Sequence, residues 1–439
     1  MSSNSANVNR LTADRFSRLK ALQRPASLPQ TKTGSDATGD QLEEVPSRSP
    51  GTAGFERLAT LLGATVCRNP HGEHLSLVSI HGEYAPCKSD SSALHLLMPD
   101  APEKVADPTQ WLFLDTETTG LSGGTGTYPF LIGLAWWEGS ELRIEQLFMR
   151  EYSEERSMLA AVAERLKEHP VLVTFNGKSF DWPLLETRFR MTRTITPPPV
   201  RAHLDFLHPA RNLWRLRLGS VKLSQLERHV LGWDRGDDMS SSDIPRIYLD
   251  FVRGGNAEPL VPIFLHNQMD LRSLAGLAGR ILSIFGDQEK PLEDGLELYG
   301  LSRICERHGQ AERARTTYEK SIGAALPAET DRAARASLAQ LAKRDRDFER
   351  ARELWESMLG NSREGYEAYE QLAIYYEHEA RNAQLALAIT RDALAQLRRA
   401  NQLAMIAADQ YRASKLQFEH RRLRLERKTQ AMAPSLFNT

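Results

Sequence analysis

The sequence is short of cysteine, of long apolar runs and of net charge, and each shortage excludes a class of protein. Its 439 residues include three cysteines, Cys67, Cys87 and Cys305, which excludes a disulfide-stapled fold and favours a reducing compartment. The longest apolar run covers residues 130–137, well below the roughly 20 residues that cross a membrane. The first residues contain no apolar core of a secretory signal, so we expect a cytoplasmic protein with no membrane partner. Because the formal net charge is −1, any nucleic-acid binding must come from local basic patches.

The composition changes along the chain and predicts several parts. Residues 1–52 are rich in Ser, Thr, Gly, Asp and Pro and are predicted to be a disordered tail. Residues 53–105 have a mixed pattern and form an N-terminal extension of the next domain, which covers 106–290. There, short apolar runs alternate with stretches of helical spacing, as is typical of an α/β layer fold. A helical region follows over 294–400, and a basic helix with a tail over 401–439, whose cationic face either meets solvent or contacts phosphates.

The helical region contains three copies of one pattern. Residues 314–322, 351–359 and 386–394 each begin with Ala, and they follow one another at spacings of 37 and 35 residues. An aromatic residue stands four positions after the Ala in the first two copies, Tyr318 and Trp355, and the third copy has a threonine there. A period close to 34 built from paired helices resembles tetratricopeptide repeats, with an unrelated helical bundle as the alternative. Because stacked repeats offer a concave surface, we expect this region to bind a protein partner or a second copy of the chain.

Two carboxylates end the first apolar strand of the α/β region. Asp115 and Glu117 stand two residues apart, so in a strand they project from the same face, at the carboxyl end where α/β sites lie. Adjacent carboxylates repel each other unless a cation neutralises them. Hard oxygen ligands of this kind suit Mg²⁺ or Mn²⁺.

Two later segments supply further groups of the same chemistry. Asp181 follows a second buried strand, predicted over 171–175. His266 and Asp270 lie four residues apart, on one face of a helix predicted over 261–284. Two oxygen-bound metal ions can activate a water and stabilise a leaving oxygen in phosphodiester hydrolysis, and a histidine can accept the water's proton.

Taken in chain order, these segments resemble the DEDD group of 3′–5′ exonucleases. The resemblance rests on Asp-Thr-Glu-Thr-Thr-Gly-Leu, on Asn-Gly-Lys-Ser-Phe-Asp and on the His before a helical Asp, and within that group it is strongest to the YprB-like branch of predicted nucleases. It implies a ribonuclease H-like fold, a mixed sheet flanked by helices, and a 3′–5′ exonuclease that uses two divalent cations, Mg²⁺ or Mn²⁺. It also implies a general base, His266, and the metal ligands Asp115, Glu117, Asp181 and Asp270. Members with a histidine base place it five residues before the last Asp, where this chain has Leu265, so the resemblance leaves the role of His266 open.

A basic segment lies between the second and third motifs. Residues 188–222 contain eight Arg and Lys residues against one acid, Asp205, with the aromatic Phe206 and Trp214 among them. Guanidinium groups neutralise phosphates and aromatic rings stack on bases, so the segment predicts binding of single-stranded DNA or RNA. A solvated basic face with a buried Trp is the alternative. The residues predicted to contact nucleic acid are Asn176, Lys178, Arg211, Trp214, Arg215 and Arg217.

These observations predict an enzyme, a metal-dependent nuclease that hydrolyses phosphodiester bonds. The alternative is a non-catalytic scaffold that holds nucleic acid and recruits protein partners through its helical repeats. Binding of divalent cations separates the two, because an inert scaffold has no need of metal at its carboxylates.

Overall fold

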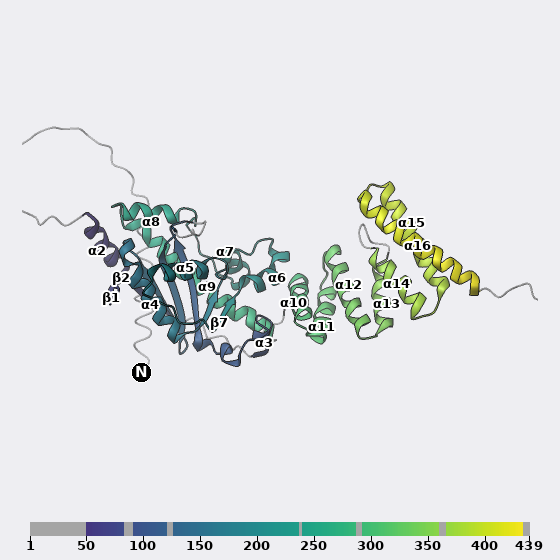
Figure 1. Cartoon of the computed structure of the whole chain (residues 1–439), viewed down its shortest axis with the longest axis horizontal. Helices are drawn as coiled ribbons and strands as arrows, with labels where there is room; N and C mark the ends of the chain where they lie inside the picture. Colours follow the sequence, from purple (N-terminus) through teal and green to yellow (C-terminus); the bar gives the residue numbers. More distant parts are fainter. Residues whose placement is uncertain are drawn as a thin grey trace, which may run out of the picture. The chain divides into compact units, whose positions relative to one another are not determined.

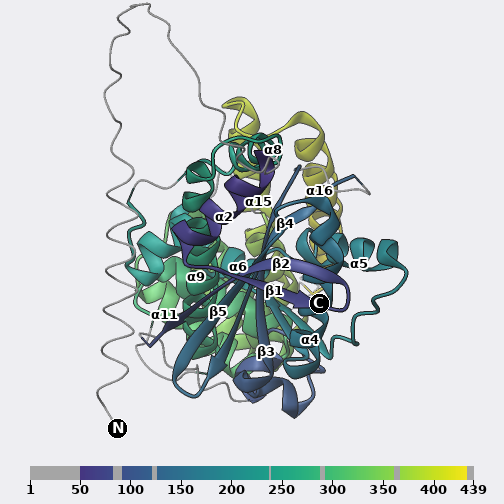
Figure 2. The ribbon, with the colours of Figure 1, turned by 90° about the vertical axis from the view of Figure 1, so that its left-hand side faces the viewer.

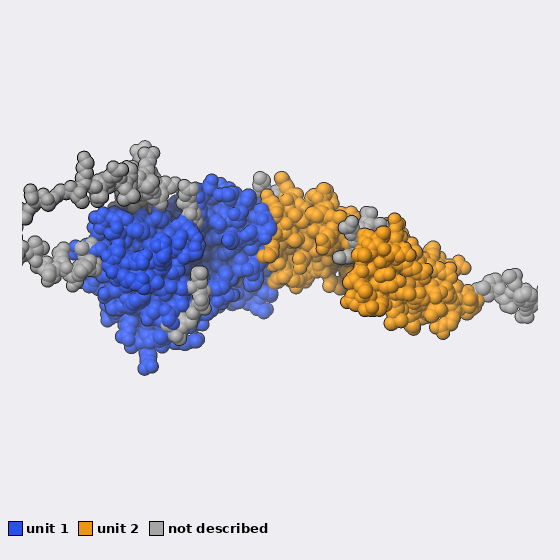
Figure 3. All heavy atoms as spheres, turned by 90° about the horizontal axis from the view of Figure 1, so that it is seen from above, with its two compact units in different colours: residues 1–211, 218–291 blue, residues 212–217, 292–439 orange. Residues whose placement is uncertain are grey.

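The computed structural model describes residues 50–82, 91–120, 126–236, 239–286, 292–359 and 366–432. The chain divides into two compact units, coloured separately in Figure 3. Unit 1 takes residues 1–211 and 218–291, and unit 2 takes residues 212–217 and 292–439. Most of the predicted tail lies outside the described residues, which begin with helix α2 at Pro50, so the disorder of the tail stays a prediction.

Unit 1 is built on one mixed sheet, whose strands run through the unit in Figure 1. Its seven strands lie in the order β1-β2-β5-β4-β3-β6-β7. Strands β1 to β5 pair antiparallel with their neighbours, and β6 and β7 continue the sheet in parallel from β3. The strands are β1 (Thr65–Asn69), β2 (Gly72–His81), β3 (Trp111–Thr118), β4 (Pro129–Glu138), β5 (Glu141–Phe148), β6 (Val171–Thr174) and β7 (Ala202–Asp205).

Helices cover both faces of this sheet, which confirms the predicted α/β fold. Helix α9 packs against β3, β4 and β5, and α4 packs against β1 and β2. Figure 2 shows α9 on one side of the strands and α4 and α5 on the other. Because both faces are covered, β4 is buried along almost its whole length, which explains its unbroken apolar sequence. The helices of unit 1 are α2 (Pro50–Leu62), α3 (Ser91–His95), α4 (Glu155–Glu168), α5 (Asp181–Thr192), α6 (Leu207–Leu218), α7 (Leu223–Leu226), α8 (Ile244–Val252) and α9 (Val261–Gly286), with the second half of α6 counted in unit 2.

One glycine allows α9 to approach the sheet closely. Gly133 of β4 lies under α9, where an added Cβ would overlap the side chains of Asn267 and Leu271. The helix can therefore bring its polar residues directly over the carboxyl end of β3. Near the start of β4, the Phe130 ring stacks on the Tyr248 ring of α8 at a centroid distance of 4.0 Å.

Unit 2 is a succession of helices, as the sequence predicts. Ala314, Ala351 and Ala386 each stand at the fourth position of a helix and are fully buried, so the three sequence copies occupy equivalent places. The tetratricopeptide character of the region stays a prediction. Over the described residues, no helix of either unit combines the length and the apolar character needed to cross a bilayer. The helices are α10 (Gly295–Arg307), α11 (Ala311–Gly323), α12 (Ala328–Arg344), α13 (Phe348–Ser357), α14 (Glu367–His378), α15 (Ala383–Gln402) and α16 (Ala408–Met432).

Candidate active site

The carboxyl end of β3 meets the start of α5. The parallel pairing of β3 with β6 stops at Phe113, so the last part of β3 is free to contact the helix that follows β6. Thr116 makes this contact, because its hydroxyl donates a 2.6 Å hydrogen bond to Oδ1 of Asp181. Asp115 and Glu117, on either side of Thr116, reach groups of α9 instead. The strand thus joins carboxylates from two separate motifs.

Asn267 of α9 fixes the Asp115 side chain. Its amide nitrogen donates a 2.8 Å hydrogen bond to Oδ2 of Asp115, and its amide oxygen accepts one of 2.8 Å from Nε2 of Gln146. Asn267 is fully buried, so these bonds replace the water that its amide would otherwise bind. The chain from β5 through α9 to β3 therefore holds Asp115 in one orientation.

His266 and Asp270 complete the cluster from the same helix. Nε2 of His266 lies 3.5 Å from Oδ2 of Asp270 and 3.9 Å from Oε1 of Glu117. The exposed fractions of these three side chains are 10%, 17% and 13%, so all of them lie at the edge of the interior. The imidazole stands between a strand carboxylate and a helix carboxylate, where it can exchange a proton with a water bound near either.

The cluster is electrostatically strained. Burial raises the pKa of Asp115 well above its ordinary value, and the charges of Asp270, Glu117 and Asp181 raise it further. Burial also raises the pKa of Asp181, although the hydrogen bond from Thr116 opposes that rise. Carboxylates that raise one another's pKa in this way favour a cation between them.

The donor set fits hard divalent cations such as Mg²⁺ or Mn²⁺. Carboxylate oxygens from β3, α5 and α9 are ligands that these ions prefer, and a cation would relieve the repulsion around Asp115. As the side chains stand, no three His, Cys, Asp or Glu residues of the described segments are close enough to hold one metal ion. Asp115, Glu117, Asp181 and Asp270 are therefore neighbours rather than a closed coordination shell, and their metal binding stays a prediction.

A buried ion pair lies beside Asp270. Arg235 bonds through Nε and Nη2 to both carboxylate oxygens of Glu227, and through Nη2 also to Oδ1 of Asp270. The Arg235 and Glu227 side chains are 8% and 1% exposed. Glu227 opens a π-helical turn, Glu227–Leu231, that packs against α9. The two oxygens of Asp270 thus have different neighbours, because Oδ1 faces Arg235 and Oδ2 faces His266.

Asp205 organises the loop that leads into α5. Its carboxylate accepts hydrogen bonds from the backbone N–H groups of Asn176 at 2.8 Å and of Lys178 at 3.0 Å, and from a third N–H at the start of α6. These bonds hold Asn176 at a φ of 72°, a left-handed conformation that asparagine tolerates better than most residues. The loop then presents the Phe180 side chain, 60% exposed, immediately before Asp181. Asp205 therefore has a structural role, because it holds the loop that leads to Asp181, a candidate metal ligand.

The basic segment is used partly for folding. Phe206 and Trp214 are 0% and 1% exposed, so neither ring offers a face to a base. Arg188 is also buried and forms an ion pair with Glu155 of α4. Trp214 is therefore removed from the residues predicted to contact nucleic acid. Its burial agrees with the alternative given above, a solvated basic face with a buried Trp.

The other predicted contacts differ in their availability. Lys178, Arg211 and Arg215 are exposed. The guanidinium of Arg217 forms an ion pair with the nearly buried Glu297 of α10, within unit 2, so its charge is already compensated. Lys178 and Arg211 lie in unit 1 with the carboxylates, whereas Arg215 belongs to unit 2.

Several residues that shape the cluster were not predicted. Thr116 and Asn267 stand directly beside predicted residues, so their positions in the motifs were a usable signal. Gln146, Glu227 and Arg235 lie in segments with no motif, and their contacts arise only when β5, the π-helical turn and α9 pack together. No feature of the sequence alone marks them.

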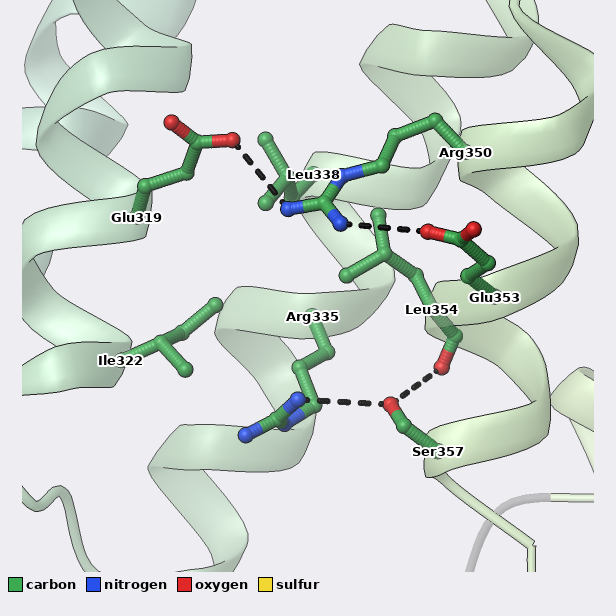
Figure 4. Close-up of a pocket in the computed structure, with 8 residues that line it drawn as sticks. All are labelled: Glu319, Ile322, Arg335, Leu338, Arg350, Glu353, Leu354 and Ser357. Carbon is green, nitrogen blue, oxygen red and sulfur yellow. Dashed lines mark hydrogen bonds and ion pairs between the residues drawn. The ribbon is translucent and has the colours of Figure 1, made fainter.

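Unit 2 contains a groove of about 400 Å³ between α11, α12 and α13, shown in Figure 4. Arg350 lies across it and pairs with Glu319 and Glu353, each at 3.3 Å. Arg335 donates a 3.3 Å hydrogen bond to the Ser357 hydroxyl on the facing helix. The groove therefore combines paired charges with an apolar floor. Its lining residues are Glu319, Ile322, Arg335, Leu338, Arg350, Glu353, Leu354 and Ser357.

Comparisons with known proteins agree with this architecture. Residues 112–282 match the RNase_H superfamily, a range that contains every residue of the carboxylate cluster. The chain is also similar to the uncharacterized protein YprB of Bacillus subtilis (strain 168), with 32% identity over 286 residues. That alignment covers 64% of this chain and 68% of YprB. Both findings agree with the resemblance to YprB-like proteins with a ribonuclease H-like fold.

Proposed function

This chain belongs to the RNase H superfamily, in one family with YprB of Bacillus subtilis, and from that membership we propose that it is a metal-dependent nuclease, a 3′–5′ exonuclease. The observation that carries the proposal is the convergence of carboxylates from three separate segments around Asp115. Clustered carboxylates repel one another unless a proton or a cation offsets their charge, and clusters with perturbed pKa values are frequent at functional sites.

In the proposed site, Asp115, Glu117, Asp181 and Asp270 hold two divalent cations, Mg²⁺ or Mn²⁺. Bound there, the cations would supply an activated water and would stabilise the charge on the leaving oxygen. The protein's own contribution is orientation. Asn267 fixes Asp115, and the N-terminus of α5 presents Asp181.

His266 is proposed as the general base. Its Nε2 points between Glu117 and Asp270, close to where the attacking water must lie if these carboxylates bind the cations. Proton acceptance by a positioned histidine contributes about 10²–10⁴-fold to a hydrolysis rate.

The proposed substrate is a single strand of DNA or RNA that enters past α5. Phe180 offers an exposed ring beside Asp181, and a ring in this place can stack on the terminal base. Lys178 and Arg211 are exposed and cationic, and Asn176 lies in the same loop as Lys178, so these residues are proposed to contact phosphate or sugar. The arginines that are buried or paired have no part in this proposal.

Unit 2 is proposed to recruit a protein partner or a second copy of the chain. The groove of Figure 4 supports this, because apolar side chains between paired charges suit an extended peptide or a helix. The proposal is independent of catalysis, so hydrolysis of short substrates should not require the partner.

The proposed function is tested with purified full-length protein and with end-labelled single-stranded DNA and RNA in Mn²⁺. We expect the wild-type protein to release mononucleotides from the 3′ end and to stop when a chelator removes the metal. The double variant Asp115→Asn, Glu117→Gln should lose at least about 10²-fold in rate, since cation binding supplies several kcal/mol of transition-state stabilisation.

The matched control makes the same two chemical changes at exposed positions of unit 1. Asp250 and Glu138 are 54% and 61% exposed, so Asp250→Asn with Glu138→Gln should leave the rate unchanged. Full activity in the Asp115 and Glu117 variant would refute the assignment. A wild-type protein that binds nucleic acid but neither binds Mn²⁺ nor cuts would instead support the scaffold alternative.

A further inference from the structure

We infer that Arg235 is a positioning residue: anchored on Glu227, it holds Oδ1 of Asp270 so that Oδ2 stays directed toward the divalent-cation site. The inference rests on the proposed function, since it assigns a role within the same site. Its basis is the pair of contacts that Arg235 makes at once, a two-point bond to Glu227 and a bond to Asp270.

The bonds to Glu227 set the position of the Arg235 guanidinium, so it does not move with the Asp270 side chain. Two parallel bonds to a carboxylate set both the position and the plane of an arginine head group. Glu227, which receives those bonds, is 1% exposed and lies in the π-helical turn. A lysine could not reproduce the two parallel bonds to Glu227, because its ammonium group lacks the planar pair of N–H donors of a guanidinium.

The loop that carries Arg235 is attached to α9 at a second point. The Trp233 backbone N–H donates a 2.9 Å hydrogen bond to the Glu227 carbonyl and closes the π-helical turn. The Trp233 ring lies against Gly276 of α9, where an added Cβ would overlap it. Trp233 and Arg235 therefore both contact α9, the helix that bears Asp270. Through these two contacts the loop holds the Arg235 guanidinium beside the Asp270 carboxylate.

Two roles of Arg235 predict opposite changes in metal affinity. If Arg235 were only a positive charge beside the site, it would repel Mn²⁺, and its removal would tighten Mn²⁺ binding. If it positions Asp270, its removal lets the carboxylate turn away, and Mn²⁺ binding weakens. Loss of a residue that orients a metal ligand typically lowers metal affinity about 10–100-fold.

The test is isothermal titration calorimetry of the full-length protein with Mn²⁺ alone, so that it does not depend on hydrolysis. Arg235→Gln is expected to bind Mn²⁺ about 10–100-fold more weakly than wild type. Arg235→Lys keeps the positive charge but loses the two parallel N–H donors of the guanidinium. It is expected to weaken Mn²⁺ binding by at least about 10-fold as well. The matched control is Arg228→Gln, because Arg228 lies in the same turn, is 61% exposed and pairs with the exposed Asp234; it should bind as wild type does.

Unfolding in urea, measured without metal, separates a change of affinity from a change of stability. If Arg235→Gln fails to fold, Arg235→Lys decides the question. Unchanged or tighter Mn²⁺ binding in the folded variant would overturn the positioning role while leaving the proposed nuclease intact. Absence of Mn²⁺ binding in the wild-type protein would overturn the proposed metal site, and the inference with it.

Discussion

Glu377 in unit 2 is buried and Asp115 in unit 1 is partly buried, and the surroundings of the two acids are opposite. The Glu377 side chain is 1% exposed and is met by bases of α16, Arg424 at 2.6 Å, Lys428 at 3.5 Å and Arg421 at 3.9 Å. Asp115 accepts a hydrogen bond from Asn267, and the charges of Asp270, Glu117 and Asp181 raise its pKa beyond the effect of burial. One acid is neutralised by its own chain, and the other is left with a surplus of like charge.

This difference separates a structural charge from a functional one. A buried acid that serves packing is paired, because an uncompensated charge in the interior costs several kcal/mol. A cluster of carboxylates is balanced either by a proton or by a bound cation, and in unit 1 the proposed divalent cations would supply the balance. Arg235 offsets part of the negative charge through its bond to Asp270.

The largest effect on this comparison is expected from His266. His266→Gln removes the proton acceptor between Glu117 and Asp270 but keeps a polar side chain. The rate of hydrolysis in saturating Mn²⁺ should fall about 10²–10⁴-fold, because general base catalysis is lost. Single-turnover kinetics on end-labelled DNA or RNA measure this loss directly.

The exposed His229 provides the control for that measurement. His229→Gln makes the same chemical change outside the cluster and should leave the rate unaltered. A loss below about 10-fold in His266→Gln, with Mn²⁺ affinity unchanged, would show that another group accepts the proton and that His266 only packs beside the carboxylates.

The next effect tests the structural side of the comparison. Glu377→Gln leaves three bases without their shared acid, and the loss of a charged hydrogen bond costs about 1.5–3 kcal/mol. Urea unfolding followed by circular dichroism should show a lower free energy of unfolding, and Mn²⁺-dependent hydrolysis of short substrates should persist below the unfolding transition. Equal stability of wild type and variant would mean that the α16 bases turn to solvent at no cost.

The sequence predicted the fold well where the pattern is periodic and local. Apolar runs such as the one that became β4 report burial on both faces, and the carboxylates of β3 follow from alternation along a strand. The basic face of the last helix was harder to interpret. Two of its arginines, Arg421 and Arg424, pair with Glu370 and Glu377 of α14, so part of its positive charge is used within unit 2. Charge composition does not reveal a partner that lies far away in the chain.

The same limit applies within the candidate site. Asp115, Glu117 and Asp270 could be placed from motif spacing, because spacing fixes the face of a strand or helix. Trp214 could not be recognised as buried, since an aromatic residue among arginines reads equally well as a stacking platform. Arg235 could not be recognised at all, because its role depends on the packing of the π-helical turn against α9.

The smallest effect tests the raised pKa of Asp115, and it is a dependence of stability on pH in the absence of metal. A carboxyl group whose pKa is raised by folding binds its proton more tightly in the folded protein than in the unfolded chain. For Asp115, the tighter proton binding contributes its full stabilisation of the folded protein below the ordinary pKa of 3.8. This stabilisation is lost as the pH rises through the raised pKa of the folded state. With chelator present, the free energy of unfolding in urea should therefore fall for wild type relative to Asp115→Asn as the pH rises above about 4, and saturating Mn²⁺ should reverse the order of the two proteins. Mn²⁺ should not reverse the order of wild type and Glu377→Gln, because Glu377 lies in unit 2, outside the proposed cation site. Parallel curves for wild type and Asp115→Asn would mean that folding does not raise the pKa of Asp115.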